Sequence, residues 1–480
     1  MLKRLLAVAA LLILWGQRGA AQSAPAQKCG CAQDFDYVTS YLERNLPAYT
    51  HDVTPLTQPE YERLKHRLRR ASERVKREAE CLPVLISYVE FFRDQHTDIS
   101  GASRPGVNDQ DAAAVRQFQA SADYQQTETI RSQPGRAHSL AAIEGLYQTS
   151  DGTYEVQIQP ARTPFRDYVG IIVKSKTPLW QAGQVKLELQ RRPGKQRYRV
   201  IQYNRNHSAS YLGEITQEQG YLRGTSWQKV GLPPPPVPAP LAYRALTTTT
   251  AYLRLPSFDG GLQAQLDSVY RRVAASPPQN LIIDVRGNGG GSDNNVVPLV
   301  PLLYTAPFQD DQLEEYYATP DNVARFAEYY RGMKRDSMGY GASALQHFRA
   351  TLRWLQQVPT GQFQTDPTAT LKTFTGTAGL PNRVVILYDR GCASSCETLL
   401  FWAKHSTKTT LAGENSGGFV GYGNVFSVAT PCLGLQLRAT TLRLPNQVAY
   451  EGIGIAPDVR LAPDEDWLNQ AIRLIEKPKE

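Results

Sequence analysis

The sequence predicts an α/β multidomain protein, because three different patterns follow one another along its 480 residues. Helical periodicity dominates residues 33–100, and alternation of apolar and polar residues follows from 142 to about 230. Apolar strands then alternate with helical stretches, which indicates an α/β core. The length supports this division, because one hydrophobic core rarely serves so long a chain.

The first 22 residues have the layout of a secretory signal peptide. Basic residues at positions 3 and 4 precede an apolar run, and small residues follow at 19–21. We expect cleavage near Ala21 or Gln22, and an uncleaved membrane anchor is the alternative because Arg18 lies in the cleavage region. No later segment has 18 uninterrupted apolar residues, so no membrane span is expected after cleavage.

Neither the net charge nor the composition indicates a polyanionic partner. Removal of residues 1–22 takes away three basic residues and no acidic one, so the net charge falls from +8 to +5. No block of Lys and Arg is interleaved with aromatic residues, so we expect no nucleic-acid partner. The oligomeric state is not defined by one sequence.

The even number of cysteines in a chain with an export signal favours disulfides over free buried thiols. Three cysteines, at positions 29, 31 and 81, lie near the N-terminus, and three, at positions 392, 396 and 432, lie in the C-terminal part. Each group allows one bridge and leaves one thiol, unless the two remaining thiols pair with each other. Their spacing matches no zinc site, and we expect no metal or cofactor.

The N-terminal half is expected to hold two domains. Residues 23–105 are predicted to be helical, because apolar residues such as Leu64 and Leu68 recur at steps of three and four. Residues 106–141 are polar and are predicted to form a linker. Residues 142–230 alternate with period two and predict a small antiparallel sheet or barrel.

A proline-rich linker at 231–245 separates this β domain from the predicted core, residues 246–480. Residues 280–285 and 383–388 are apolar runs typical of buried strands, and a helix is expected from about Ser394. Residues 310–358 carry two helical stretches and are most simply an insertion.

Two turns that follow buried strands can carry chemistry. The first, Asp284–Ser292, contains three consecutive glycines that can present bare N–H groups to a ligand. It lacks the spacing of a dinucleotide or phosphate loop, so a tight turn without function is the competing interpretation. The second turn places Ser394 at a helix N-terminus, where neighbouring N–H groups favour a developing oxyanion. Alternatively, Ser394 only caps this helix.

Together the two turns resemble those of the tail-specific (C-terminal processing) serine peptidases. That family has a D-x-R-x-N-x-G-G motif, matched from Asp284, and a nucleophilic Ser three residues before a Glu, matched by Ser394 and Glu397. Its G-E-x-[ST]-x-G segment is present at 413–418. The resemblance covers residues 250–460 and implies a crotonase/ClpP-like α/β protease core. The β domain stands where we would expect a peptide-binding PDZ module.

One departure from the family concerns the general base. Ser-Lys members place the Lys directly after the last Gly of that segment, where this chain has Phe419. Another group must therefore take the serine proton, because a hydroxyl at its ordinary pKa is a poor nucleophile. Histidine is the obvious substitute near pH 7.

The resemblance to tricorn-type relatives, which use Ser, His and Glu, suggests that substitute. His96 lies in a D-x-H-T segment like theirs, and Glu451 precedes a G-x-G segment at the position of their acid. On local grounds, His96 is equally a cap or surface residue and Glu451 a turn carboxylate. The rival base is His405, but it ends the helix that Ser394 begins, about 15 Å away.

These residues imply acyl transfer from a protein or peptide substrate. Ser394 would be the nucleophile, His96 the base and Glu451 the group that orients the imidazole. The N–H of Ser395 and that of Gly289 or Gly290 would bind the oxyanion. Two alternatives remain: a hydrolase of non-peptide acyl groups, and a catalytically silent module that holds an apolar ligand or a protein partner.

Overall fold

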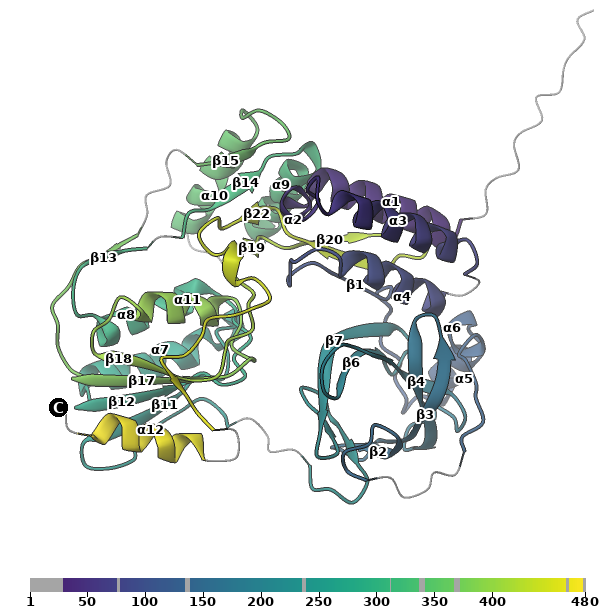
Figure 1. Ribbon diagram of the computed structural model, residues 1–480, viewed down its shortest axis with the longest axis horizontal. Coiled ribbons are helices and arrows are strands. Elements are labelled where there is room, and N and C mark those ends of the chain that lie inside the picture. The colour runs from purple at the N-terminus through teal and green to yellow at the C-terminus, as the bar shows by residue number, and fades with distance from the viewer. Residues whose placement is uncertain are drawn as a thin grey trace, which may run out of the picture.

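The computed structural model describes residues 29–75, 78–133, 139–234, 239–310, 312–335, 342–366, 372–462 and 466–477. The predicted signal peptide, residues 1–22, lies outside these ranges. Among the described residues, none of the helices is both long and apolar enough to cross a bilayer. Figure 1 shows a layered α/β unit and a β-barrel as separate lobes, with the N-terminal helices above the barrel.

The N-terminal helices form because each has one apolar face. Tyr61 and Leu68 are buried and Leu64 is partly buried, which confirms the stripe read from the sequence. Their side chains belong to the same hydrophobic core as those of the barrel. The helices are α1 (Cys31–Asn45), α2 (Pro47–Asp52), α3 (Gln58–Ser72) and α4 (Glu78–Val89).

The alternating segment closes into an antiparallel barrel, in which each strand pairs with the next and β9 returns to β2. Two short helices, α5 (Ala112–Gln119) and α6 (Ala122–Gln125), precede it in the chain. The barrel strands are β2 (Gly145–Thr149), β3 (Tyr154–Thr163), β4 (Arg166–Ser175), β5 (Val185–Arg191), β6 (Arg197–Tyr203), β7 (Ala209–Glu218), β8 (Tyr221–Leu222) and β9 (Trp227–Lys229).

The α/β unit is built on a six-stranded sheet in the order β10-β11-β12-β17-β18-β23. The edge strand β10 runs antiparallel to β11, and the other pairs are parallel. The strands are β10 (Ala242–Ala245), β11 (Thr250–Arg254), β12 (Asn280–Asp284), β17 (Arg383–Tyr388), β18 (Thr409–Gly413) and β23 (Val459–Arg460).

Helices cover both faces of this sheet (Figure 1). One face packs against α7 (Gln263–Ala275), α8 (Val300–Leu303) and α11 (Ser395–Ala403), and the other against α12 (Trp467–Glu476). Both faces are therefore apolar, which explains why β12 and β17 read as continuous apolar runs. Because β12 and β17 are parallel neighbours, the turns that follow them meet at one edge of the sheet.

The predicted insertion contains two helices, α9 (Pro320–Arg335) and α10 (Ala342–Leu355). Short strands join this region to the C-terminal part of the chain, since β14 (Glu315–Tyr317) pairs with both β15 (Phe363–Thr365) and β22 (Leu442–Arg443). The remaining two-residue strands are β13 (Phe308–Gln309), β16 (Thr373–Phe374) and β19 (Tyr422–Gly423).

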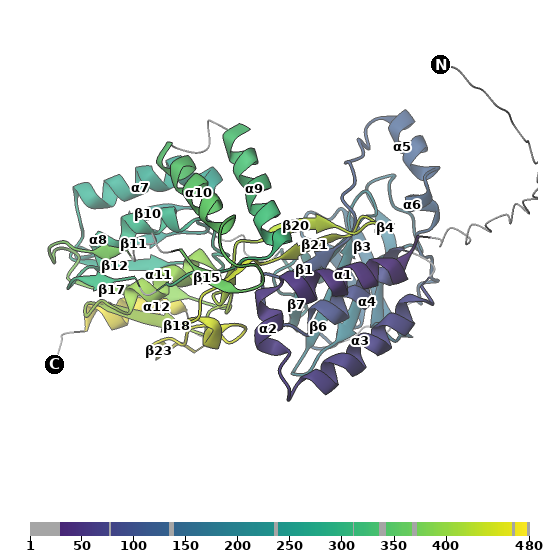
Figure 2. The same cartoon turned by 90° about the horizontal axis from the view of Figure 1, so that it is seen from above.

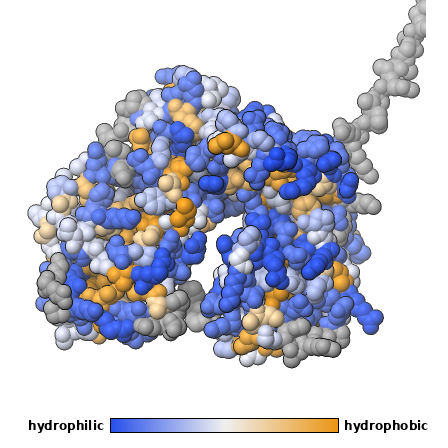
Figure 3. Space-filling view, viewed as in Figure 1, coloured by the Kyte–Doolittle hydropathy of each residue, from blue (hydrophilic) through white to orange (hydrophobic). Residues whose placement is uncertain are grey.

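The C-terminal part also reaches the N-terminal helices. After α4, β1 (Asp98–Ser100) pairs with β21 (Gln436–Ala439), which pairs with β20 (Phe426–Ala429). Figure 2 shows these strands running between the sheet and the helices. In Figure 3 the α/β lobe and the barrel lobe are separated by an open gap below this junction. The loop after α4 is thereby brought toward the α/β unit.

Each of the two cysteine groups forms one internal bridge, Cys31–Cys81 and Cys392–Cys396. The two remaining cysteines, Cys29 and Cys432, pair across 403 positions. The chain therefore adopts the arrangement in which the two leftover thiols meet, and this bridge ties the start of α1 to the loop before β21.

Candidate active site

Ser394 lies in a strained turn between β17 and α11. Its φ of 55° and ψ of −124° lie in a region that residues other than glycine rarely adopt. It does occupy the N-cap position of α11, but ordinary N-cap residues have extended backbone angles with negative φ. Strain of this kind persists only where neighbouring groups enforce it, and it concentrates at functional sites. A strand-to-helix turn of this kind exposes a nucleophilic Oγ in many hydrolases.

The buried carboxylate of Glu397 holds this turn. Its Oε2 accepts the N–H of Ser394 at 3.0 Å and that of Phe419 at 2.8 Å. Its Oε1 accepts Ser416 Oγ at 2.5 Å and the N–H of Gly418 at 2.8 Å. Burial raises the pKa of Glu397, while these four donors act to lower it. Glu397 therefore connects the turn to the loop after β18, a role that the sequence motif did not specify.

The glycine turn after β12 packs directly against Ser394. A Cβ added at Gly290, whose φ is 95°, would lie 2.9 Å from Ser394 Cβ and 2.6 Å from the Ala393 carbonyl oxygen. Only glycine fits this approach. The carbonyl of Asn288 accepts the N–H of Ala393 at 3.0 Å, which joins the two turns through their backbones.

The side chain of Asn288 distinguishes the two glycines proposed for the oxyanion site. Asn288 Nδ2 donates to the carbonyl of Leu255 at 3.1 Å, and its Oδ1 accepts the N–H of Gly290 at 2.9 Å. The N–H of Gly290 is therefore occupied. Within the described chain, the N–H groups of Gly289 and of Ser395, the first residue of α11, have no acceptor. Asn288 is part of the motif that begins at Asp284, but the sequence did not indicate that its side chain accepts the N–H of Gly290.

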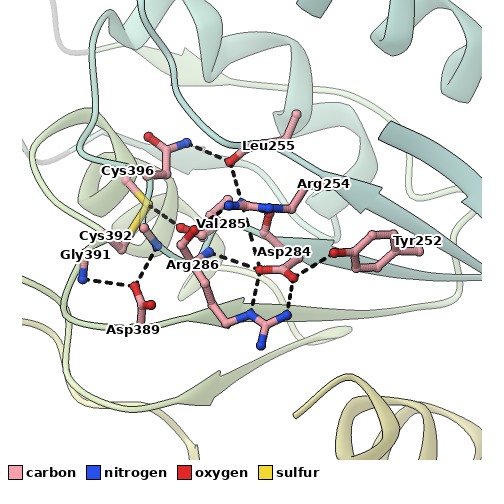
Figure 4. Close-up of polar contacts among 12 residues, drawn as sticks. Tyr252, Arg254, Leu255, Asp284, Val285, Arg286, Asp389, Gly391, Cys392 and Cys396 are labelled. Carbon is pink, nitrogen blue, oxygen red and sulfur yellow. Dashed lines mark hydrogen bonds and ion pairs between the residues drawn. A yellow bond between two sulfur atoms is a disulfide. The ribbon is translucent and has the colours of Figure 1, made fainter. Parts of the chain in front are cut away.

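A charged network holds the start of the glycine turn, directly after β12 (Figure 4). Asp284, at the end of β12, accepts hydrogen bonds from Tyr252 Oη at 2.8 Å and from Arg286 Nε at 2.9 Å. Burial acts to raise the pKa of Asp284, but Arg286 and Arg254 together outweigh it, so the pKa falls below its usual value. Arg254 donates to the backbone carbonyls of Asp284 and Arg286 at 2.9 and 2.7 Å. The turn is thus fixed on both sides.

A second acidic residue joins the two turns to each other. Asp389 Oδ1 accepts the N–H of Gly287 at 2.7 Å and that of Gly391 at 2.9 Å. Figure 4 shows Asp389 and Gly391 beside the Cys392–Cys396 disulfide. The Ser394 turn and the glycine turn therefore form one preassembled unit.

His96 and Glu451 come together from distant parts of the chain. A ring nitrogen of His96 and carboxylate oxygens of Glu451 and Asp94 all lie within 4.8 Å of one another. Glu451 follows the 3₁₀ helix η4 (Val448–Tyr450) and receives three backbone N–H groups. These come from Gln95 on Oε1 at 2.8 Å, and from Val420 at 2.9 Å and Gly421 at 2.6 Å on Oε2. Glu451 therefore fastens the His96 loop to the loop after β18.

The environment shifts the pKa of both groups. Burial, with a smaller contribution from Arg438, lowers the pKa of His96 to about 4, so its imidazole is neutral at pH 7. Burial and the nearby Asp94 raise the pKa of Glu451 to about 8. A neutral imidazole can accept a proton, and an ionised Glu451 would stabilise the imidazolium that results.

Asp94 is a member of this cluster that sequence reasoning did not assign. It accepts the N–H of His96 at 3.0 Å and the hydroxyls of Thr97 and Thr440 at 2.6 Å each. Burial raises its pKa to about 6. The D-x-H-T spacing was the available signal. Because the Asp94 carboxylate accepts these donors and the Glu451 carboxylate accepts three backbone N–H groups, hydrogen bonds account for both carboxylates, and we assign no metal to this cluster.

Phe419 connects the His96 loop to the Ser394 turn. Its ring meets the His96 ring edge to face, with centroids 5.4 Å apart, while its N–H binds Glu397 beside that of Ser394. Within the described residues, no hydrogen bond joins Ser394 Oγ to His96, or His96 to Glu451. Nδ1 of His96 is buried without a partner. His405, the rival base, stacks on Phe308 with ring centroids 4.6 Å apart, at the other end of α11.

The fold and the site together indicate a protease core, and the comparison with protein families supports this conclusion. The family model for peptidase family S41 matches residues 249–461. Residues 249–461 are therefore similar to that family of tail-specific peptidases, as the motifs predicted, and the protein is a serine-type peptidase. No curated protein matches the chain.

Several solved structures are similar at low identity. Mature CPAF has a TM-score of 0.47 and 12% identity, with 90% of this chain and 92% of CPAF covered. A putative peptidase from Parabacteroides merdae has a TM-score of 0.44 and 12% identity, with coverage of 93% and 97%. The photosystem II D1 C-terminal processing protease has a TM-score of 0.38 and 14% identity, with coverage of 93% and 97%.

Proposed function

We propose that the protein is an exported serine endopeptidase that hydrolyses peptide bonds through an acyl-enzyme on Ser394. The observation that carries this proposal is the strained turn that presents Ser394, together with the N–H groups of Gly289 and Ser395, which have no acceptor among the described residues. Nothing in an inert helix cap requires a positive φ at a serine. The core, residues 246–480, would have the crotonase/ClpP-like organisation implied by its motifs.

In the proposed reaction, His96 accepts the proton of Ser394 Oγ as the oxygen attacks the substrate carbonyl carbon. The N–H groups of Ser395 and Gly289 stabilise the negative oxygen of the tetrahedral intermediate. His96 then donates its proton to the leaving amine, and the C–N bond breaks. Water repeats the cycle on the acyl-enzyme, with His96 as base, and releases the acid.

His96 must approach Ser394 Oγ for this reaction. Catalytic hydrogen bonds are often long or absent without substrate and tighten in the Michaelis complex. Glu451 is held by three backbone N–H groups and lies next to the His96 ring, so it can orient the imidazole when the ring turns toward Ser394. Phe419, in edge contact with that ring, occupies the place where Ser-Lys members carry their base.

Export to the periplasm or the extracellular space is part of the proposal. Its support is the signal-like segment at 1–22 together with the three disulfides, which form and persist in oxidising compartments. The substrate would be a protein or a peptide.

The decisive experiment compares Ser394→Ala with the parent. We expect the variant to lose peptide cleavage by roughly 10⁶-fold, because the acyl-enzyme cannot form. A fluorophosphonate should label the parent and not the variant. Ser276→Ala, at an exposed position after α7, serves as the matched control and should behave as the parent.

Labelling that persists in Ser394→Ala would disprove the assignment of the nucleophile. A parent that is neither labelled nor active, yet binds an apolar ligand or a protein, would favour the silent binding module. Cleavage of esters without cleavage of any peptide would favour a hydrolase of other acyl groups.

A further inference from the structure

The Cys392–Cys396 disulfide encloses the nucleophile. Ser394 lies midway between the two cysteines, both of which are fully buried. The other two bridges among the described residues join positions 403 and 50 apart, whereas this one joins positions four apart. A bridge stabilises a fold mainly by restricting the unfolded chain, and the restriction grows with the length of the closed loop. A bridge that closes so short a loop adds little stability in this way, so we look for its function in the local structure.

The local feature inside this loop is the backbone of Ser394. With a φ of 55°, Ser394 would relax toward the negative φ of an ordinary helix cap unless its neighbours prevented it. The bridge joins the residue at the start of the turn to one in the first turn of α11. It therefore limits how far the chain between them can unwind or rotate.

Hydrogen bonds hold this loop at its ends and at its centre. Cys392 donates its N–H to Asp389 at 2.9 Å, and its carbonyl accepts the N–H of Gly417 at 2.8 Å. The N–H of Cys396 donates to Ala393 at 3.1 Å. Ser394 donates its N–H to Glu397 Oε2 at 3.0 Å, and its carbonyl accepts the N–H groups of Glu397 and Thr398 at 2.6 and 3.2 Å. The disulfide adds to them a covalent restraint across the same turn, which does not open as a single hydrogen bond can.

We propose that the Cys392–Cys396 disulfide is a positioning element for catalysis, which keeps Ser394 Oγ and the N–H of Ser395 aligned with the reacting carbonyl. This inference deepens the proposed function and rests on it. A displacement of about 1 Å in a reacting group can cost about 10²-fold in rate, and relaxation of Ser394 φ would move Oγ at least that far. Both cysteines are fully buried and so are not exposed to a substrate, and binding should change little.

The test is a double variant, Cys392→Ser with Cys396→Ser, compared with Cys29→Ser with Cys432→Ser as matched control. We expect kcat and the rate of fluorophosphonate labelling to fall about 10²-fold in the first variant, with KM within about threefold of the parent. The control should keep the parental kcat at a temperature where circular dichroism shows all three proteins folded. A crystal structure of the first variant should show Ser394 with a negative φ.

Parental labelling rates in the folded double variant would overturn the positioning role while leaving Ser394 as the nucleophile. An equal loss of kcat in both double variants would overturn it as well, because the effect would then be general. If the Ser pair does not fold, Cys392→Ala with Cys396→Ala is the second variant, and failure of both to fold would assign the bridge to global stability instead. A parent that fluorophosphonate does not label at Ser394 would remove the proposed function, and the positioning role would fall with it.

Discussion

The two halves of the candidate site are held in different ways. The nucleophile half consists of Ser394 and the glycine turn, and it follows two adjacent parallel strands, β12 and β17. Its contacts join residues of one α/β unit. The base half, His96 and Glu451, joins the loop after α4 to a loop 356 positions later, and no strand of the main sheet carries either residue.

The nucleophile half is therefore preassembled within one unit, whereas the base half depends on how the N-terminal helices pack against the C-terminal part of the chain. The nucleophile half is tied by Glu397, Asn288, Asp389 and a disulfide, and its strain is already present without substrate. In the base half, the His96 ring has no hydrogen bond to either partner among the described residues. Substitutions in the two halves should therefore fail in different ways.

His96→Ala should have the largest effect in the base half. We expect peptide cleavage to fall by roughly 10⁶-fold, because nothing else takes the serine proton. The matched control is His405→Ala, which should keep parental activity because its ring lies against Phe308. Steady-state kinetics on one peptide measures both variants. If His405→Ala is inactive and His96→Ala is not, the assignment of the base is wrong and that of the nucleophile stands.

Glu451→Gln should lower kcat by about 10⁴-fold, since an amide cannot stabilise the imidazolium in the same way. It should also change the pH profile. The pKa of Glu451 is raised to about 8, so the carboxyl holds its proton below that pH and loses it above. Activity of the parent should therefore rise with pH through about 8, while the pKa of His96, about 4, lies too low to limit it.

The variant should lack this rise, because glutamine does not titrate. Initial rates measured between pH 5 and 10 would show the difference. The same rise in parent and variant would mean that another group controls the profile, and that Glu451 only fastens the two loops.

In the nucleophile half, Asn288→Ala should lower kcat by about 10²–10³-fold, the effect of losing one oxyanion donor. The reason is indirect, because Asn288 holds the Gly290 N–H and thereby sets the path of the Gly289 backbone. Asn280→Ala, at the other end of β12, is the matched control and should stay close to the parent. Unchanged kcat in Asn288→Ala would exclude this turn from the oxyanion site.

The smallest effect on rate should come from the long-range bridge. The pair Cys29→Ser and Cys432→Ser should lower the free energy of unfolding by about 2–5 kcal/mol with little change in kcat, because the bridge restrains the unfolded chain. Urea unfolding monitored by circular dichroism measures it. An unchanged unfolding midpoint would show that β1, β20 and β21 hold the N-terminal helices without the bridge.

Sequence reasoning reached further in the nucleophile half than in the base half, for a physical reason. Strand, glycine turn and helix start are local patterns, so the apolar runs before Asp284 and Ser394 predicted where both turns would lie. His96 carried no comparable signal, because a histidine after a helix is ordinary. Its place beside Glu451 was expected only through resemblance to a family.

The sequence by itself determined the α/β order of the core, the alternation that closes into a barrel, and the turn that carries Ser394, because each depends on neighbours in the chain. Only the tertiary structure decided that Cys29 reaches Cys432, that Asn288 occupies the Gly290 N–H, and that Asp94 joins His96 and Glu451. The contacts of Cys29 with Cys432 and of the His96 loop with Glu451 join distant parts of the chain, because packing of whole elements brings them together. The Asn288 contact is local, but its geometry depends on how the glycine turn packs against the Ser394 turn.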